Sequence, residues 1–143
     1  MEITTTQLCL TGVIMEIAEF VHEVFGEAFF RTVLSVPRLS GAFDLLPLTI
    51  SERLMGEDFQ QGATVAIGGQ LRSYNKVMGG AGRLLLTAFA QHLRPVDEEE
   101  NPNTVFLSGA LCKPPSFRTT PFGREIADLM LAVNRSYGKS DYI

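Results

Sequence analysis

The feature that most constrains the fold of this chain is an internal repeat. When the sequence is shifted by 97 residues, "LTGVIMEIAEFVHEVFGEAFFRTVLSVPRLSGAFDLL" aligns without a gap with "LSGALCKPPSFRTTPFGREIADLMLAVNRSYGKSDYI", and ten of the 37 positions are identical. The identities are Leu10/Leu107, Gly12/Gly109, Phe20/Phe117, Phe25/Phe122, Gly26/Gly123, Leu34/Leu131, Val36/Val133, Arg38/Arg135, Gly41/Gly138 and Asp44/Asp141. Because the shared glycines and phenylalanines mark the same turns, we interpret the repeat as a tandem duplication.

Each copy has the pattern of β-strands. "QLCLTGVIMEI" and "TVFLSGALC" alternate around a central glycine, which is typical of a strand that bends or lets another backbone approach closely. The turn signals "VFGE" and "PFGR" lead into "AFFRTVLSV" and "EIADLMLAV". The second of these runs also fits a helical period, but its length and the preceding glycine turn favour a strand. "DLLPLTIS" follows as a third strand, in which Pro47 predicts an edge or a bulge.

The first copy continues beyond the repeated part. "ERLMGEDFQQG" predicts a helix with Ser51 as N-cap and Gly62 as terminator. "ATVAIGGQLRSY" then predicts a fourth strand, "NKVMGGAG" a flexible loop and "RLLLTAFAQHL" a fifth strand. This order is the pattern of the OB-fold, a five-stranded Greek-key barrel. We therefore expect an all-β chain with one short helix: a complete OB-fold over residues 1–95, and the first two to three strands of a second over residues 103–143.

Charge is distributed unevenly along the chain. The formal net charge of -4 argues at first against a nucleic-acid partner, because phosphate attraction needs a basic surface. However, the run "DEEE" lies in "PVDEEENPN", which is typical of a solvated linker and is placed at residues 96–102. Residues 101–143 carry five basic and three acidic side chains. The acidity is therefore concentrated in the linker, and the second copy is basic.

The sequence lacks the residue patterns that several classes of function require. Cys9 and Cys112 have no Cys or His at metal-ligand spacing, His22 and His92 belong to no catalytic pattern, and "MGGAG" lacks P-loop spacing. We predict that the chain is not an enzyme and uses no metal or cofactor. Its apolar runs are too short to span a bilayer and its N-terminus lacks signal-peptide features, so we expect a soluble protein in the cytoplasm and no membrane partner.

Two stretches resemble a known family. "NTVFLSGALCKPPSFRTTPFGREIADLMLAVNR" is similar to the N-terminal signature of bacterial single-stranded DNA-binding proteins, roughly NxVxLxGxLxxxPxxRxTxxGxxxAxFxLAxxR. "FQQGATVAIGGQLRSY" resembles the other end of the same domain, where a helix ending in Lys-Gly leads to VxIxGxLR. The matching positions are Asn103, Leu107, Gly109, Pro115, Arg118, Thr119, Gly123, Ala127, Leu131 and Ala132, and Gly62, Val65, Ile67, Gly69, Leu71 and Arg72. The resemblance spans nearly the whole chain in pieces and implies a tandem OB-fold protein with an incomplete second copy.

The resemblance implies that the chain binds single-stranded DNA without sequence preference, in replication, recombination or repair. It also implies a bacterial, nucleoid-associated homo-oligomer that has replication or repair proteins as further partners. Such binding, for which this family is a standard example, combines phosphate contacts with base stacking on aromatic side chains. The stacking positions of the family correspond to Tyr137 and Tyr142, whose repeat partners are Ser40 and Leu45. The basic residues near this pair are Arg118, Arg124, Arg135 and Lys139.

The first copy offers a second set of candidates around its glycine-rich loop, which wraps DNA in this family. These residues are Arg72, Tyr74, Lys76 and Arg83. Residues that recur in both copies also admit a structural role. We interpret Phe20, Phe25, Phe117 and Phe122 as core or turn-packing residues, and the repeated Arg38 and Arg135 fit a structural role equally well.

The alternative function is a protein-interaction or assembly module without strong DNA binding. The net charge and the absence of aromatic residues at Ser40 and Leu45 motivate it. An unfinished barrel also exposes strand edges, which is a liability. The chain is then a fragment of a longer protein, or its second copy packs on the first copy or on a neighbouring chain, or the second copy is loosely ordered. We favour a truncated form whose second copy is ordered by strand pairing, within an oligomer.

Overall fold

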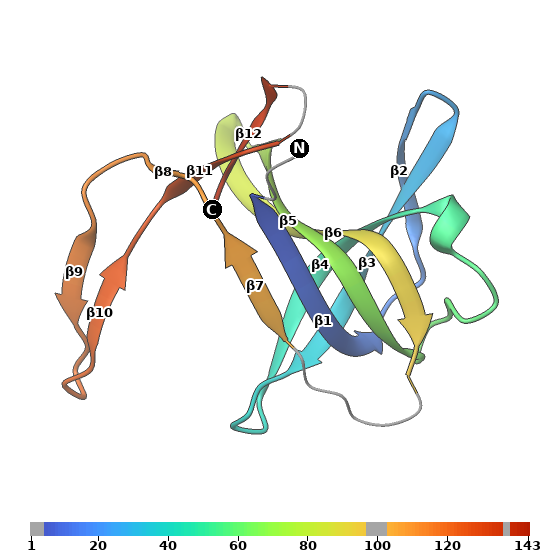
Figure 1. Ribbon diagram of the computed structural model, residues 1–143, viewed down its shortest axis with the longest axis horizontal. Coiled ribbons are helices and arrows are strands. Elements are labelled where there is room, and N and C mark those ends of the chain that lie inside the picture. The colour runs from blue at the N-terminus through green and yellow to red at the C-terminus, as the bar shows by residue number, and fades with distance from the viewer. Residues whose placement is uncertain (1–4, 97–102, 136–137) are drawn as a thin grey trace.

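The computed structural model, drawn in Figure 1, describes residues 5–96, 103–135 and 138–143. Its strands are β1 (Thr6–Ile14), β2 (Glu19–Val24), β3 (Glu27–Pro37), β4 (Phe43–Ser51), β5 (Thr64–Met78), β6 (Ala81–Pro95), β7 (Thr104–Leu107), β8 (Ala110–Leu111), β9 (Ser116–Thr119), β10 (Glu125–Asp128), β11 (Leu131–Asn134) and β12 (Ser140–Tyr142). A 3-10 helix, η1 (Glu52–Leu54), follows β4. Among the described residues, none of the helical structure is long and apolar enough to cross a membrane.

The strands of the first copy close into a barrel. The main sheet has the order β2-β3-β4-β6-β5-β1-β7, and β3 also pairs with β1, which closes the ring. β4 and β6 run parallel and pair only at Leu48↔Ala88 and Thr49↔Phe89, next to Pro47. All other neighbours in this sheet are antiparallel. Five strands arranged in this way form the OB-fold that the element order predicts, so the predicted fold class is confirmed.

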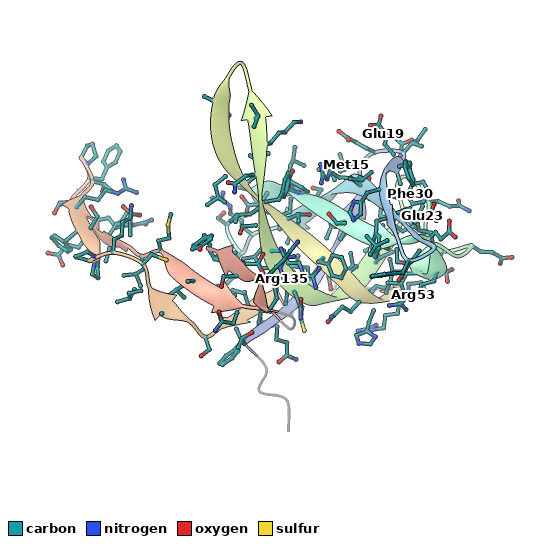
Figure 2. All side chains as sticks on the ribbon, turned by 90° about the horizontal axis from the view of Figure 1, so that it is seen from above. Met15, Glu19, Glu23, Phe30, Arg53 and Arg135 are labelled. Atoms are coloured by element: carbon teal, nitrogen blue, oxygen red, sulfur yellow. The ribbon has the colours of Figure 1, made fainter. Side chains whose placement is uncertain are left out.

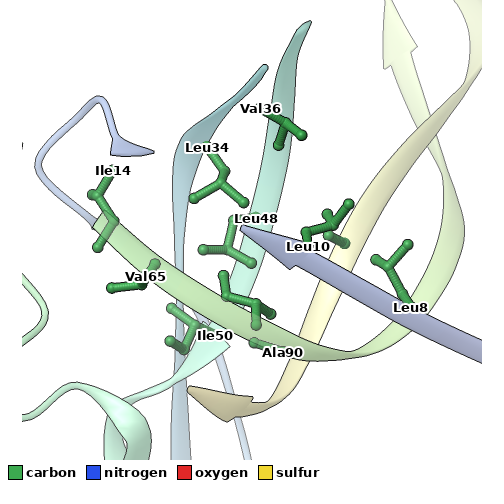
Figure 3. Packing of buried hydrophobic residues seen from close by; sticks show 11 residues of the cluster. Leu8, Leu10, Ile14, Leu34, Val36, Leu48, Ile50, Val65 and Ala90 are labelled. Carbon is green, nitrogen blue, oxygen red and sulfur yellow. The ribbon is translucent and has the colours of Figure 1, made fainter. Parts of the chain in front are cut away.

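Aliphatic side chains fill the barrel. Alternate residues of a strand point to opposite faces, and the inward set is apolar on β1, β3, β4, β5 and β6. Leu34, Leu48, Ile50 and Val65 are completely buried, and Figure 3 shows them packed together with their neighbours. Burial of each large aliphatic side chain stabilises the fold by about 1.5–3 kcal/mol. This cluster makes the barrel a rigid support for the residues on its outer face.

The helix expected over residues 52–62 is much shorter than predicted. Ser51 does cap it, because its Oγ accepts a hydrogen bond from the Arg53 amide (3.4 Å), but the helix ends after one turn at Leu54. The segment after it packs Leu54, Met55 and Phe59 against the barrel core. Three apolar side chains within six residues, together with Gly56, favour an irregular covering segment over a regular helix.

The predicted flexible loop over residues 75–82 is also mostly regular structure. The β5–β6 ladder continues through Lys76↔Arg83 to Met78↔Ala81. Only Gly79 and Gly80 remain for the turn, with φ of 59° and 83°. A two-residue hairpin turn with both φ values positive suits the twist of the strands and is readily adopted by Gly-Gly.

The duplication is visible in the backbone pairing. Equivalent residues of the two copies pair in the same way: Val13↔Ser35 and Ala110↔Ala132, Ile14↔Leu34 and Leu111↔Leu131, Val36↔Asp44 and Val133↔Asp141. The repeated glycines are equally close to the opposite strand. A Cβ atom on Gly12 would lie 2.4 Å from Ser35 O, and one on Gly109 would lie 2.3 Å from Ala132 O. Glycine thus allows the same close approach in each copy.

The strands of the second copy are shorter than the sequence predicts. The strand expected over residues 104–112 is divided into β7 and β8, and the one expected over residues 125–133 into β10 and β11. β9 and β10 form a separate two-stranded sheet, and β8, β11 and β12 a three-stranded one. The strands of the second copy are therefore short and divided between these two small sheets, apart from β7 in the main sheet.

The second copy is attached to the first copy of the same chain. β7 extends the main sheet by pairing with β1, and Leu8 lies opposite Val105 in this ladder. These two residues are repeat partners, so a local two-fold axis relates the paired strands. Flanking contacts follow this symmetry: Asn103 Nδ2 donates to Pro37 O (3.3 Å) and Thr5 Oγ donates to Asn134 O (2.6 Å), and the two acceptors are again repeat partners. Pairing within the chain therefore covers the edge of β1.

The close approach at Gly12 predicts a stability effect. Gly12→Ala should destabilise the fold by about 1–3 kcal/mol, because the new methyl group would collide with a backbone carbonyl. Gly82→Ala is the matched control, since a Cβ at this position on β6 meets nothing within 4 Å. Urea denaturation followed by circular dichroism measures both variants. Equal midpoints would contradict the account of the barrel closure.

Candidate nucleic-acid interface

The β5–β6 hairpin is a basic element in an acidic chain. Residues 64–95 contain four Arg or Lys residues and no Asp or Glu, whereas the chain as a whole has a formal net charge of -4. Figure 2 shows the distal part of the hairpin projecting away from the barrel. A protruding ribbon without carboxylates attracts polyanions even when the protein is acidic overall.

The four residues predicted around the glycine-rich loop share one face of this hairpin. Arg72 pairs with Thr87, Tyr74 with Leu85, and Lys76 with Arg83. Residues two apart on a strand, and residues directly opposite each other on neighbouring strands, point to the same face. Lys76 and Arg83 are exposed and lie directly opposite each other, where like charges repel. A bound phosphate would relieve that repulsion.

Arg72 is held flat against the sheet. Its guanidinium carbon lies 3.7 Å from the centre of the Phe89 ring, and its Nε and Nη2 donate to Gln70 Oε1 at 3.0 and 2.8 Å. Burial, followed by the repulsion of Arg135, lowers the pKa of Arg72 to about 10. The side chain therefore stays protonated at neutral pH in a fixed orientation on the outer face of the barrel.

Arg31 and Phe89, which no sequence pattern singled out, belong to the same face. The Arg31 guanidinium carbon lies 4.6 Å from the centre of the Tyr74 ring, so one side of the tyrosine is covered. The Nε of Arg31 is buried and has no hydrogen-bond partner among the described residues. Alternation along β3 could have placed Arg31 outward, but only the folded barrel brings β3 to β5.

Ser73 on β5 anchors the end of the second copy. Its amide donates to Asp141 Oδ1 (2.8 Å), its carbonyl oxygen accepts from Arg135 Nη2 (3.2 Å), and its Oγ accepts from the Tyr142 amide (2.8 Å). Ser73 thus joins β12 to β5 between Arg72 and Tyr74 in sequence, although the side chains of these two residues point to the opposite face from that of Ser73. The side chain of Tyr142 is 44% exposed there, and Lys139 is exposed in the turn before β12.

Arg135 has internal partners. Its Nε donates to Asp141 Oδ2 (2.6 Å), its Nη2 also reaches Asp141, and Asp141 is completely buried. The geometry therefore favours the structural role that its repetition suggested. In the first copy, the equivalent pair of Arg38 and Asp44 is 59% and 42% exposed, and the hydrogen bond from Arg38 lowers the pKa of Asp44.

The remaining predicted residues do not join this face. Arg118 and Arg124 lie on the β9–β10 hairpin, where Arg118 Nε donates to Asp128 Oδ2 (2.9 Å) and Arg124 is exposed. Tyr137 lies outside the described residues. The structure thus gathers one group around β5, β6 and β12 and places a second basic group on a separate hairpin.

The interpretation of the repeated phenylalanines as core or turn-packing residues is wrong for the residues at the hairpin tips. Phe25 and Phe122 are fully exposed, at 105% and 101%, and Phe20 and Phe117 are 59% and 66% exposed. Phe20 does pack edge-to-face on Phe30, with ring centres 5.9 Å apart. The tips extend beyond the barrel, so no core reaches these rings.

A pocket of about 560 Å³ lies between the barrel and β7. Its lining is mostly aliphatic, with Leu8, Leu46 and Val105 among the contributors, and the charged groups in it, Arg38 and Asp44, neutralise each other. Within the described ranges no three His, Cys, Asp or Glu side chains are placed to hold a metal ion. The exposed side chains around β5 and β6 are basic and aromatic, and such side chains are suited to binding a ligand by charge and by ring stacking.

Comparison with solved structures agrees with this architecture. The N-terminal domain of PriB protein from Thermoanaerobacter tencongensis, solved as a dimer, is 44% identical; the match covers 65% of this chain and 98% of that domain, with a TM-score of 0.56. The chain belongs to the bacterial single-stranded DNA-binding protein family.

Longer members of this family match both copies. A deletion mutant of the single-stranded DNA binding protein from Thermus aquaticus matches 96% of this chain and 72% of its own at 21% identity, with a TM-score of 0.70. The wild-type form of that protein matches 96% and 71% at 21% identity, with a TM-score of 0.68. At 96% coverage the shared fold includes the second copy. No protein-family model and no curated protein matches the sequence.

The buried ion pair predicts a difference between equivalent positions. Asp141→Ala should destabilise the attachment of the second copy by about 3–5 kcal/mol, because Arg135 would be left without its buried partner. Asp44→Ala, the matched change in the first copy, should have little effect because that pair is exposed. Urea denaturation and hydrogen exchange at the Ser73 amide measure the two variants. Equal effects of the two would show that Ser73 does not anchor the second copy.

Proposed function

We propose that the chain binds single-stranded DNA without sequence preference, and that the face carrying Arg72, Tyr74, Lys76 and Arg83 is the principal contact. The observation that carries this proposal is the charge of the β5–β6 hairpin, which has four basic and no acidic residues. Residues 1–63, in contrast, have three basic and nine acidic residues. Electrostatic attraction therefore directs a polyanion to one side of the molecule.

The residues of this face are suited to two kinds of contact, with phosphate and with bases. Lys76 and Arg83 are exposed and suited to phosphate, whereas Arg72 is fixed on Phe89 and presents a positioned charge. Tyr142, which is 44% exposed, and the half-buried Tyr74 offer rings for stacking. Stacking uses the flat face that every base has, so it binds without reading sequence. Tyr137, predicted from the family pattern, is a further stacking candidate.

The family supports a role in bacterial replication, recombination or repair, with a homo-oligomer as the working form. The related Thermus aquaticus protein is described as single-stranded DNA binding, and the PriB domain was solved as a dimer. The acidic surface of residues 1–63 is available for replication or repair proteins. It also motivates the alternative of an assembly module, which the experiments below distinguish.

Salt dependence tests the electrostatic part of the proposal. Binding of oligo-dT, measured by fluorescence anisotropy, should weaken linearly in log K against log salt concentration, with a slope of about -0.7 for each phosphate neutralised. The double variant Lys76→Ala/Arg83→Ala should reduce the magnitude of that slope by about 1.4. Arg53→Ala, which removes a cation of η1 that is paired with Glu27, is the charge control and should leave the slope unchanged. Absence of binding at low salt would refute the proposed function.

Tyr142 tests the stacking part. Tyr142→Ala should weaken oligo-dT binding about 5- to 150-fold, the range expected for one stacked base. Its repeat partner Leu45 is 64% exposed, and Leu45→Ala should leave the affinity unchanged. Unchanged affinity in the Tyr142 variant would favour the assembly module, and sedimentation of the same samples would then show whether oligomers persist without DNA.

A further inference from the structure

The β2–β3 and β9–β10 hairpins are repeat partners that both present phenylalanine to solvent. Phe25 and Phe122 occupy the tips. Phe20 on β2 and Phe117 on β9 lie five residues before them in the sequence. Figure 1 shows these two hairpins at opposite ends of the molecule. Large exposed rings on protruding elements are typical of binding surfaces.

The two pairs of phenylalanines are exposed to nearly the same extent. The first copy has all five barrel strands, and Phe20 and Phe25 are nevertheless 59% and 105% exposed. Their equivalents Phe117 and Phe122 have nearly the same values, 66% and 101%. Exposure of the rings is thus a property that the two hairpins share.

The two tips are constructed differently, yet each ends in an exposed phenylalanine. In the first copy β2 contains a bulge between Phe20 and His22, and the turn consists of Phe25 and Gly26, with φ of 49° and 81°. In the second copy β9 and β10 pair without a bulge, and Pro121 lengthens the turn, which the Thr120 amide closes by donating to Arg124 O (2.8 Å). The ring thus remains at the tip although the backbone differs.

The charges around the rings are reversed between the copies. Residues 16–31 contain four acidic residues and one basic residue, whereas the equivalent residues 113–128 contain three basic and two acidic residues. Glu16 corresponds to Lys113, and Glu27 at the turn corresponds to Arg124. Glu27 is bound by Ser51 and Arg53, but Arg124 makes no ion pair with any residue that the structure describes. Only the second hairpin combines exposed rings with an uncommitted cation.

We propose that the β9–β10 hairpin is a second single-stranded DNA contact, in which Phe122 stacks on a base and Arg124 binds the adjacent phosphate. This inference rests on the proposed function and extends the interface beyond the β5–β6 hairpin. The two hairpins are connected through β11 and β12, because β12 is hydrogen-bonded to β5 at Ser73 and pairs with β11, which follows β10 in the chain. The acidic β2–β3 hairpin repels phosphate and does not bind DNA, although it carries the same rings.

Tryptophan substitution tests the contact directly. The chain contains no tryptophan, so Phe122→Trp introduces a single fluorophore on the second hairpin and Phe25→Trp introduces one at the equivalent place on the first. Both sites are fully exposed, and neither change should affect folding. Titration with oligo-dT should quench the fluorescence of the Phe122→Trp protein and leave that of the Phe25→Trp protein unchanged.

Affinity provides the second readout. Phe122→Ala should weaken binding of an oligo-dT long enough to span both sites about 5- to 150-fold, and Phe25→Ala should have no effect. Arg124→Glu, which installs the charge found in the first copy, should weaken binding and lower the salt slope.

The outcomes separate this inference from the proposed function. If the unmodified chain binds oligo-dT but the Phe122→Trp signal does not change, or if the two alanine variants behave alike, the hairpin contact is wrong while the proposed function stands. If the unmodified chain does not bind oligo-dT at low salt, both are wrong.

Discussion

The antiparallel pairing of β1 with β7 brings a strand together with its own repeat. Leu8 lies opposite its repeat partner Val105, so the pairing generates a local two-fold axis inside one chain and covers the edge that a lone barrel would expose. A second attachment is made at Ser73 of β5, which binds Arg135 and Asp141. The strand that carries Tyr142 is therefore held on the first copy both by this contact with β5 and by the β1–β7 pairing.

The same two residues serve different purposes in the two copies. The buried Asp141 and the half-buried Arg135 bind Ser73 and fix the second copy in place, whereas Arg38 and Asp44 keep the same pairing in an exposed position. The hairpins show a similar divergence, in which the phenylalanines are retained and the charges are reversed. Duplication has thus preserved the backbone registers while the surfaces have specialised, one acidic and one cationic.

Much of the architecture could be predicted from local patterns. The offset of 97 residues, the strand order and the cap at Ser51 all appear in the structure, because alternation, glycine turns and capping depend on neighbouring residues. The helix over residues 52–62 and the flexible loop over residues 75–82 were wrong, because packing of Leu54, Met55 and Phe59 and continuation of the β5–β6 ladder outweighed local preference. The exposure of Phe25 and Phe122 was missed because a phenylalanine in a hairpin resembles a core residue until the reach of the hairpin beyond the barrel is known.

By itself the sequence determined the duplicated β pattern, the candidate residues Arg72, Tyr74, Lys76 and Arg83, and the separation of charge along the chain. Side-chain alternation and charge are carried by individual residues, so they can be read without a fold. Only the tertiary structure decided that these four residues share a face, that Arg31 and Phe89 join them, that Arg135 is occupied by Asp141, and that Phe122 is accessible. Each of these properties depends on which distant strands become neighbours, and barrel closure together with the β1–β7 pairing sets those neighbours.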